Sequence, residues 1–104
     1  MNDAADGVVE AVFGVLLAGD RYEAHRGRAE FRGGKLVGLQ IGRIPGRQDE
    51  GGLTVGFTLL TAVAGEPSGA GTFARGRAVT RVYVRGVLDS EADLGDVDVS
   101  TDRL

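Results

Sequence analysis

The chain of 104 residues contains no cysteine, no tryptophan and only one histidine. Without thiols it can form neither a disulfide framework nor a thiolate metal site, and it has no cysteine nucleophile. A single imidazole also leaves zinc without most of its usual ligands. These absences exclude much of enzyme chemistry, so we expect no cofactor and no bound metal.

The sequence also lacks a long hydrophobic run. The longest one, residues 8–18, is interrupted by Glu10 and Gly14. It is therefore far shorter than the roughly 20 apolar residues that a membrane-spanning helix needs. The first residues, MNDAAD, are acidic, whereas a secretory signal begins with basic residues. We therefore expect a cytoplasmic protein with no membrane partner.

What remains is the composition of an ordinary globular domain. Hydrophobic residues make up 42% of the chain and charged residues 26%, and the net charge is -3. These proportions argue against wholesale disorder, a collagen repeat or a coiled coil. A chain of this length has room for one domain rather than two.

The first hydrophobic segment has the spacing of an amphipathic helix. Its apolar residues recur at i, i+1, i+4, i+5, i+8 and i+9 over residues 8–17, which places them on one helical face. Asn2 or Asp3 can cap its start, and Gly19 stands where a helix often ends. Glycines and valines lower the helix propensity, so we expect this helix to depend on packing against a sheet.

After Gly19 the hydrophobic period changes from that of a helix to that of a strand. Phe73 and Val79 break the alternation in the last long segment, so we expect a bulge or bend near Gly76. The connections at 33–34, 45–52 and 65–71 are rich in glycine and typical of hairpins. The segments with strand character are residues 21–32, 35–44, 53–63 and 72–88.

A helix followed by hairpin-connected strands predicts an α+β fold, because such short connections leave no room for crossover helices. We expect one N-terminal helix packed on a four- to five-stranded antiparallel sheet that is strongly curved or closed into a small barrel. Residues 1–88 would form this single domain. The acidic residues 89–104 would form a C-terminal tail or a short edge strand.

Charge is unevenly distributed along the chain. Residues 1–20 carry four acidic groups, residues 21–85 carry eleven basic against five acidic groups, and residues 86–104 carry six acidic groups and one arginine. Arginines and one tyrosine alternate along the last predicted strand, where they could neutralise phosphates and stack a base of single-stranded RNA. Equally, these arginines could pair with acidic residues and solvate an exposed face. The candidate binding residues are Arg75, Arg77, Arg81, Tyr83 and Arg85.

The one histidine, His25, is predicted on the same strand face as Glu23. One hypothesis is a small-ligand pocket, or an isomerase-like or cyclase-like enzyme, between the helix and the curved sheet near Tyr22. In that hypothesis His25 acts as the base and Asp20 or Glu23 orients its ring. The alternative is a solvated histidine on a polar strand.

Both faces of the predicted sheet carry apolar residues, since Leu36, Ile44 and Leu60 lie off the main apolar faces. One face would cover the helix, and part of the other would meet a neighbour. We therefore expect a non-enzymatic structural, assembly or protein-binding module that binds itself as a homo-oligomer, or binds another protein. The arginine face and the acidic segment would serve as complementary contact surfaces. Nucleic-acid binding and the ligand pocket remain the alternatives.

Overall fold

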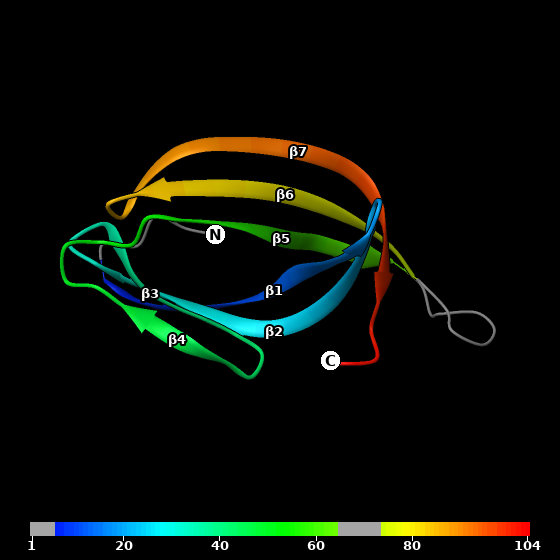
Figure 1. Cartoon of the computed structure of the whole chain (residues 1–104), viewed down its shortest axis with the longest axis horizontal. Coiled ribbons are helices and arrows are strands. Elements are labelled where there is room, and N and C mark those ends of the chain that lie inside the picture. Colours follow the sequence, from blue (N-terminus) through cyan, green and yellow to red (C-terminus); the bar gives the residue numbers. More distant parts are fainter. Residues whose placement is uncertain (1–5, 65–73) are drawn as a thin grey trace.

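The computed structural model describes residues 6–64 and 74–104, and all of its regular structure is β-strand. Seven strands follow one another along the chain (Figure 1). None of the described residues belongs to a helix that could cross a membrane. The strands are β1 Gly7–Ala18, β2 Arg21–Arg32, β3 Lys35–Ile41, β4 Ile44–Gln48, β5 Val55–Ala64, β6 Ala74–Val84 and β7 Val87–Ser100.

The expected N-terminal helix is wrong, and with it the α+β class. Residues 7–18 form β1, which pairs antiparallel with β2 from Gly7 opposite Phe31 to Ala18 opposite Arg21. The valines of this segment favour an extended chain. Glycine fits position 14 of this strand, because a Cβ there would lie 3.1 Å from the ring of Tyr22. The valines that weakened the predicted helix therefore favour the observed strand.

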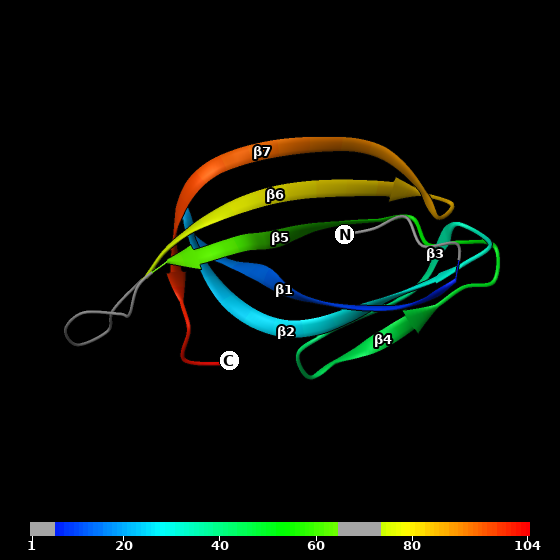
Figure 2. The same ribbon diagram turned by 180° about the vertical axis from the view of Figure 1, so that it is seen from behind.

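The seven strands form one mixed sheet that closes into a partial ring. The strand order is β1-β5-β6-β7-β2-β3-β4, and β1 also pairs with β2, so five strands make the ring while β3 and β4 extend from β2. Two short contacts complete the closure. Two residue pairs join β1 to β5, and three residue pairs join β7 to β2 in parallel. Figures 1 and 2 show the end of β7 turning across the molecule to reach β2.

Two clusters of buried apolar side chains lie on opposite faces of the same strands. On β1, Phe13 belongs to one cluster and Val12 packs against the other; on β5, the same holds for Leu59 and Leu60. Successive strand residues point to opposite faces. Both faces of the sheet are therefore covered in part by the chain itself. The buried members are Phe13, Ala29, Phe31, Leu36, Leu39, Leu53, Phe57, Leu59 and Tyr83 in the aromatic cluster, and Ala24, Leu60, Ala78, Val97 and Val99 in the aliphatic cluster.

A closed set of three backbone hydrogen bonds ties the β6–β7 turn to two other segments. The N–H of Leu36 donates to the carbonyl of Gly86 (2.9 Å), Gly86 donates to Leu53 (2.8 Å), and Leu53 donates to Leu36 (2.8 Å). Gly86 has a φ of 80°, and a Cβ on it would lie 3.0 Å from the carbonyl oxygen of Leu36. A Cβ on Gly52 would overlap the carbonyl of Arg85. Only glycines allow the three segments to approach so closely.

The strand predictions differ in how well they locate the elements. The segment 21–32 has the bounds of β2, whereas 35–44 is divided by a turn at Gly42 and Arg43 into β3 and the start of β4. Because β4 runs to Gln48, part of the connection expected at 45–52 is strand. The pairing of β6 with β7 shifts register after Ala78, two residues beyond Gly76, and again after Val82. The connection expected at 65–71 lies outside the described residues.

Residues 87–100 form a 14-residue strand that pairs with β6 along its length. They are therefore longer and more fully paired than a tail or a short edge strand. The physical reason is the arrangement of charge, since the acidic residues of this segment stand opposite the arginines of β6. Cross-strand pairs of opposite charge stabilise a sheet. A segment that is acidic in the sequence thus becomes part of the ring.

Candidate functional site

Three arginines of the candidate nucleic-acid face are held by carboxylates of the neighbouring strand. Arg81 is the most enclosed, with a side chain that is 17% exposed, against 58% for Arg77. A carboxylate competes with phosphate for the same guanidinium donors. The structure therefore shows the arrangement in which the arginines pair with acidic residues. The pairs are Arg75 with Asp98 (3.0 Å), Arg77 with Asp93 (3.4 Å) and Arg81 with Glu91 (2.6 Å).

Tyr83 lies in the aromatic cluster and is buried. Its ring stacks on Phe57, with 5.7 Å between the ring centroids, and meets Phe31 edge to face at 6.3 Å. Tyr83 thus provides no platform for a base, although it shares the odd-numbered side of β6 with Arg75 and Arg77. Sequence alternation placed these residues on one side but could not show that this side is exposed at one end of the strand and covered at the other.

The neighbours of Tyr83 form an exposed apolar surface at the end of the β6–β7 hairpin. Val82 and Val84 flank Tyr83 and so point to the opposite side of β6. Val84 stands directly opposite Val87 in the pairing of β6 with β7, and all three valines are exposed. We call Val82, Val84 and Val87 the hairpin patch. The sequence analysis missed this patch because the valines continue an apolar strand face that was expected to be buried.

Two opposite charges stand beside the hairpin patch. Arg85 occupies the turn with a φ of 50°, and its backbone N–H donates to Oγ1 of Thr54 at 3.0 Å. Asp89 follows on β7. Within residues 6–64 and 74–104 neither the Arg85 guanidinium nor the Asp89 carboxylate has an ion-pair partner. The ion pairs between β6 and β7 therefore end where the hairpin patch begins.

His25 and Glu23 are brought together as the shared strand face predicts. Nε2 of His25 and Oε1 of Glu23 lie 2.7 Å apart, and both residues line a cavity of about 740 Å³ beside the β3–β4 turn. Glu23, rather than Asp20, is the carboxylate that contacts the ring. Tyr22 points away and packs against the aliphatic cluster. The predicted pocket between helix and sheet is thus replaced by a cavity between strands and a turn.

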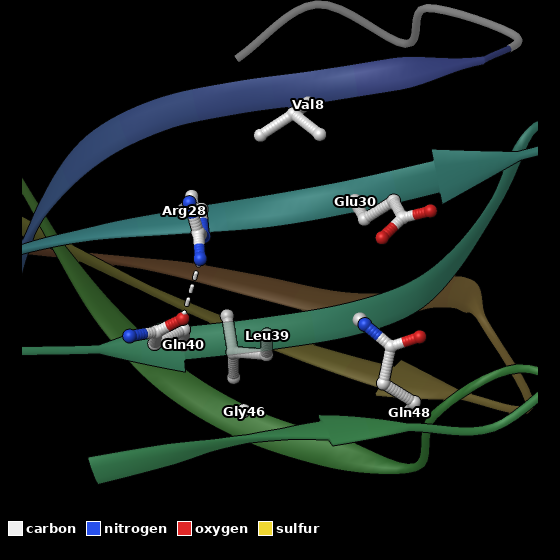
Figure 3. A pocket seen from close by; sticks show the side chains of 8 residues that line it. Val8, Arg28, Glu30, Leu39, Gln40, Gly46 and Gln48 are labelled. Atoms are coloured by element: carbon white, nitrogen blue, oxygen red, sulfur yellow. Dashed lines mark hydrogen bonds between the residues drawn. The ribbon is translucent and has the colours of Figure 1, made fainter. Parts of the chain in front are cut away.

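A second, smaller cavity of about 160 Å³ lies over β1, β2, β3 and β4 (Figure 3). Three of its four polar side chains are engaged by residues of the chain. Arg28 donates to Oε1 of Gln40 at 2.9 Å, and Glu30 accepts from Arg32 at 3.1 Å. Gly38 and Gly46 contribute no side chain to its lining. This hollow offers a ligand little polar capacity beyond what the chain already uses.

In the part of the chain that the structure describes, no group of three or more His, Cys, Asp or Glu side chains is placed to hold a metal ion. Comparison with known proteins finds no match, whether among protein-family models, curated proteins or solved structures. The fold and these sites define a small all-β domain with a partial ring, an apolar hairpin end and a histidine-containing cavity. Its function must be argued from these surfaces.

Proposed function

We propose that the protein is a non-enzymatic assembly module that associates with a second copy of itself through the hairpin patch. The observation that carries this proposal is the exposure of Val82, Val84 and Val87 on one face of a single hairpin. Contiguous exposed apolar surface is characteristic of sites where proteins meet. Gly56 on β5 lies beside Val82, and a Cβ on Gly56 would lie 3.6 Å from the valine. Because Gly56 has no side chain, nothing projects from the surface at this position. A flat partner surface can therefore reach the valines.

The rigidity of this hairpin end also supports the proposal. The three hydrogen bonds among Leu36, Leu53 and Gly86 fix the turn against β3 and the segment before β5. Association costs less when the contact surface is already ordered, because little conformational freedom is lost. The valines have few rotamers of their own.

Charge favours a second copy as the partner. In a two-fold symmetric contact, residue i of one copy meets residue j of the other and the reverse, so a surface with both charges can be complementary to itself. Arg85 and Asp89 flank the patch with opposite charges and have no ion-pair partner in the described part of the chain. Such pairs at the rim set orientation more than affinity.

The test is size-exclusion chromatography with light scattering over a wide concentration range. We expect the wild-type mass to rise from the 10.8 kDa of one chain towards twice that value. Val87→Lys should remain monomeric, because it places a hydrated charge in the patch. Val8→Lys is the matched control, since Val8 is 58% exposed on β1 and Val87 57% on β7.

The control should associate as the wild type does. A wild-type chain that stays monomeric at every concentration contradicts self-association. Equal dissociation by both lysine variants contradicts the hairpin patch as the contact.

A further inference from the structure

The cavity beside His25 has an imidazole, a guanidinium and apolar side chains in its lining. It lies between the first half of β2, the β3–β4 turn and residues 102–104. At about 740 Å³ it has the size of a small-molecule site, for which about 300–1,000 Å³ is usual. The hairpin patch lies at the turn of β6 and β7 and contributes no residue to it.

The first wall is the ring of His25, whose orientation is fixed. Oε1 of Glu23 lies 2.7 Å from Nε2. An ionised carboxylate only accepts hydrogen bonds, so the tautomer that fits this contact has its proton on Nε2 and a lone pair on Nδ1. The other oxygen of Glu23 lies 3.8 Å from Nε of Arg103, which holds the carboxylate in place. Glu23 is thus a positioning residue that presents Nδ1 as an acceptor.

The side of the ring that carries Nδ1 lies next to a glycine. Gly42 has a φ of 57°, and a Cβ on it would lie only 2.8 Å from Nδ1. Its N–H donates to the carbonyl of Arg26 at 2.8 Å, which fixes the turn beside the ring. Any side chain at this position would press against Nδ1, and glycine avoids this.

The second and third walls are a cation and an apolar surface. Arg43 follows Gly42 on the turn, lines the cavity and has no ion-pair partner within the described residues. Ile44 and Leu104 line the same cavity and are both exposed. A hydrogen-bond acceptor, a guanidinium and apolar side chains therefore converge on one space, which is the composition of a specific small-ligand site.

We propose that this cavity binds a small hydroxy acid with an apolar body. The carboxylate of the ligand pairs with Arg43, its hydroxyl donates to Nδ1 of His25, and its apolar part covers Ile44 and Leu104. This combination engages His25, Arg43 and the two apolar side chains with one molecule, while Asp102, which also lines the cavity and has no ion-pair partner within the described residues, stays in water. A simple carboxylate leaves Nδ1 without a donor, and a simple alcohol leaves Arg43 without an anion.

The test follows the single imidazole of the full-length chain by nuclear magnetic resonance. The probes are mandelate, phenylacetate, which lacks the hydroxyl, and benzyl alcohol, which lacks the carboxylate. We expect mandelate to bind about three- to tenfold more tightly than either, the usual effect of one net hydrogen bond or exposed ion pair. The Nδ1 resonance should shift more than the Nε2 resonance, because Nε2 stays bound to Glu23.

Two variants separate the interactions. Arg43→Gln should weaken mandelate binding about three- to tenfold and leave benzyl alcohol unchanged. Gly42→Asn tolerates the positive φ but places a side chain against Nδ1, so mandelate should then bind no better than phenylacetate. Arg47→Gln, on exposed β4 outside the cavity, is the matched control and should bind as the wild type does.

Equal affinities for the three probes, or no shift at Nδ1 up to the solubility limit of mandelate, overturn the proposal. Equal weakening by Arg43→Gln and Arg47→Gln shows general charge attraction and overturns it as well. If Gly42→Asn fails to fold, as judged from its amide spectrum, the comparison of the two arginine variants decides alone. Self-association is measured independently, so either proposal can fail without the other.

Discussion

At the scale of single residues, Gly86 shows how much can depend on the absence of a side chain. Its N–H and its carbonyl both take part in the hydrogen bonds that join Leu36, Leu53 and the β6–β7 turn. It adopts a φ of 80°, and a Cβ would lie 2.8 Å from the Cβ of Lys35. Conformation, hydrogen bonding and close packing all converge on this position.

We expect Gly86→Ala to lower the free energy of unfolding by about 3 kcal/mol, since the left-handed conformation alone costs roughly 1–2 kcal/mol and the close contacts add to it. Gly33→Ala is the control, because Gly33 has a φ of 59° but nothing within 4 Å of its added Cβ. It should lose only the conformational part. Urea denaturation of both variants measures the free energy of unfolding. Equal losses would show that the close contacts around Gly86 add nothing to the cost of the substitution.

At the scale of elements, the β6–β7 hairpin changes character along its length. Near its start the arginines form ion pairs with β7, and near the turn the same strand exposes valines. The pairs are not equivalent in solvation. Arg81 is mostly enclosed and lies 2.6 Å from Glu91, whereas Arg77 and Asp93 are both largely exposed at 3.4 Å. Water and salt screen the second pair more strongly.

We expect Glu91→Gln to destabilise the fold by about 1 kcal/mol and Asp93→Asn by at most about 0.5 kcal/mol, because exposed pairs contribute little. Urea denaturation at low and high salt measures both. High salt should reduce the small effect of Asp93→Asn further and leave most of the effect of Glu91→Gln. Equal losses, or equal salt dependence, would mean that the burial of Arg81 does not strengthen its pair.

At the scale of the whole molecule, the β1–β2 hairpin and the meander of β5, β6 and β7 are joined by few backbone contacts. Two residue pairs link β1 to β5 and three link β2 to β7, whereas β1 and β2 pair along most of their lengths. Packing therefore has to hold the ring together. Val99 is fully buried in the aliphatic cluster and lies opposite Tyr22 where β7 meets β2. Its side chain couples the β1–β2 hairpin to the meander.

We expect Val99→Ala to cost about 2 kcal/mol, in the range of buried large-to-small substitutions. The chain should still unfold in one transition, because both clusters draw on the same strands. Amide hydrogen exchange is the measurement, with loss of protection in β1 and β6 at the same denaturant concentration. Protection that persists in the β1–β2 hairpin after the meander has opened, or the reverse, would show that the ring is not one cooperative unit.

Local pattern predicted part of this fold and part of the candidate site. The bounds of β2 follow from its alternation and the glycines after it, and the shared face of Glu23 and His25 follows from their spacing. The helix prediction for the segment 8–18 was wrong because its apolar spacing fits one helical face as well as a strand buried on both sides. Phe13 and Val12 enter different clusters, and the sequence could not show that both faces would be covered.

The sequence by itself determined that most of the chain after Gly19 is strand and that residues 33–34 form a turn, because both depend on neighbours along the chain. Only the tertiary structure decided which side of each strand is covered. On β6 the side that exposes Arg75 also buries Tyr83, and the side that buries Ala78 also exposes Val84. Alternation assigns each residue to one side of its strand. Whether that side is covered depends on which distant strand packs against it, and the closure of the ring decides that packing.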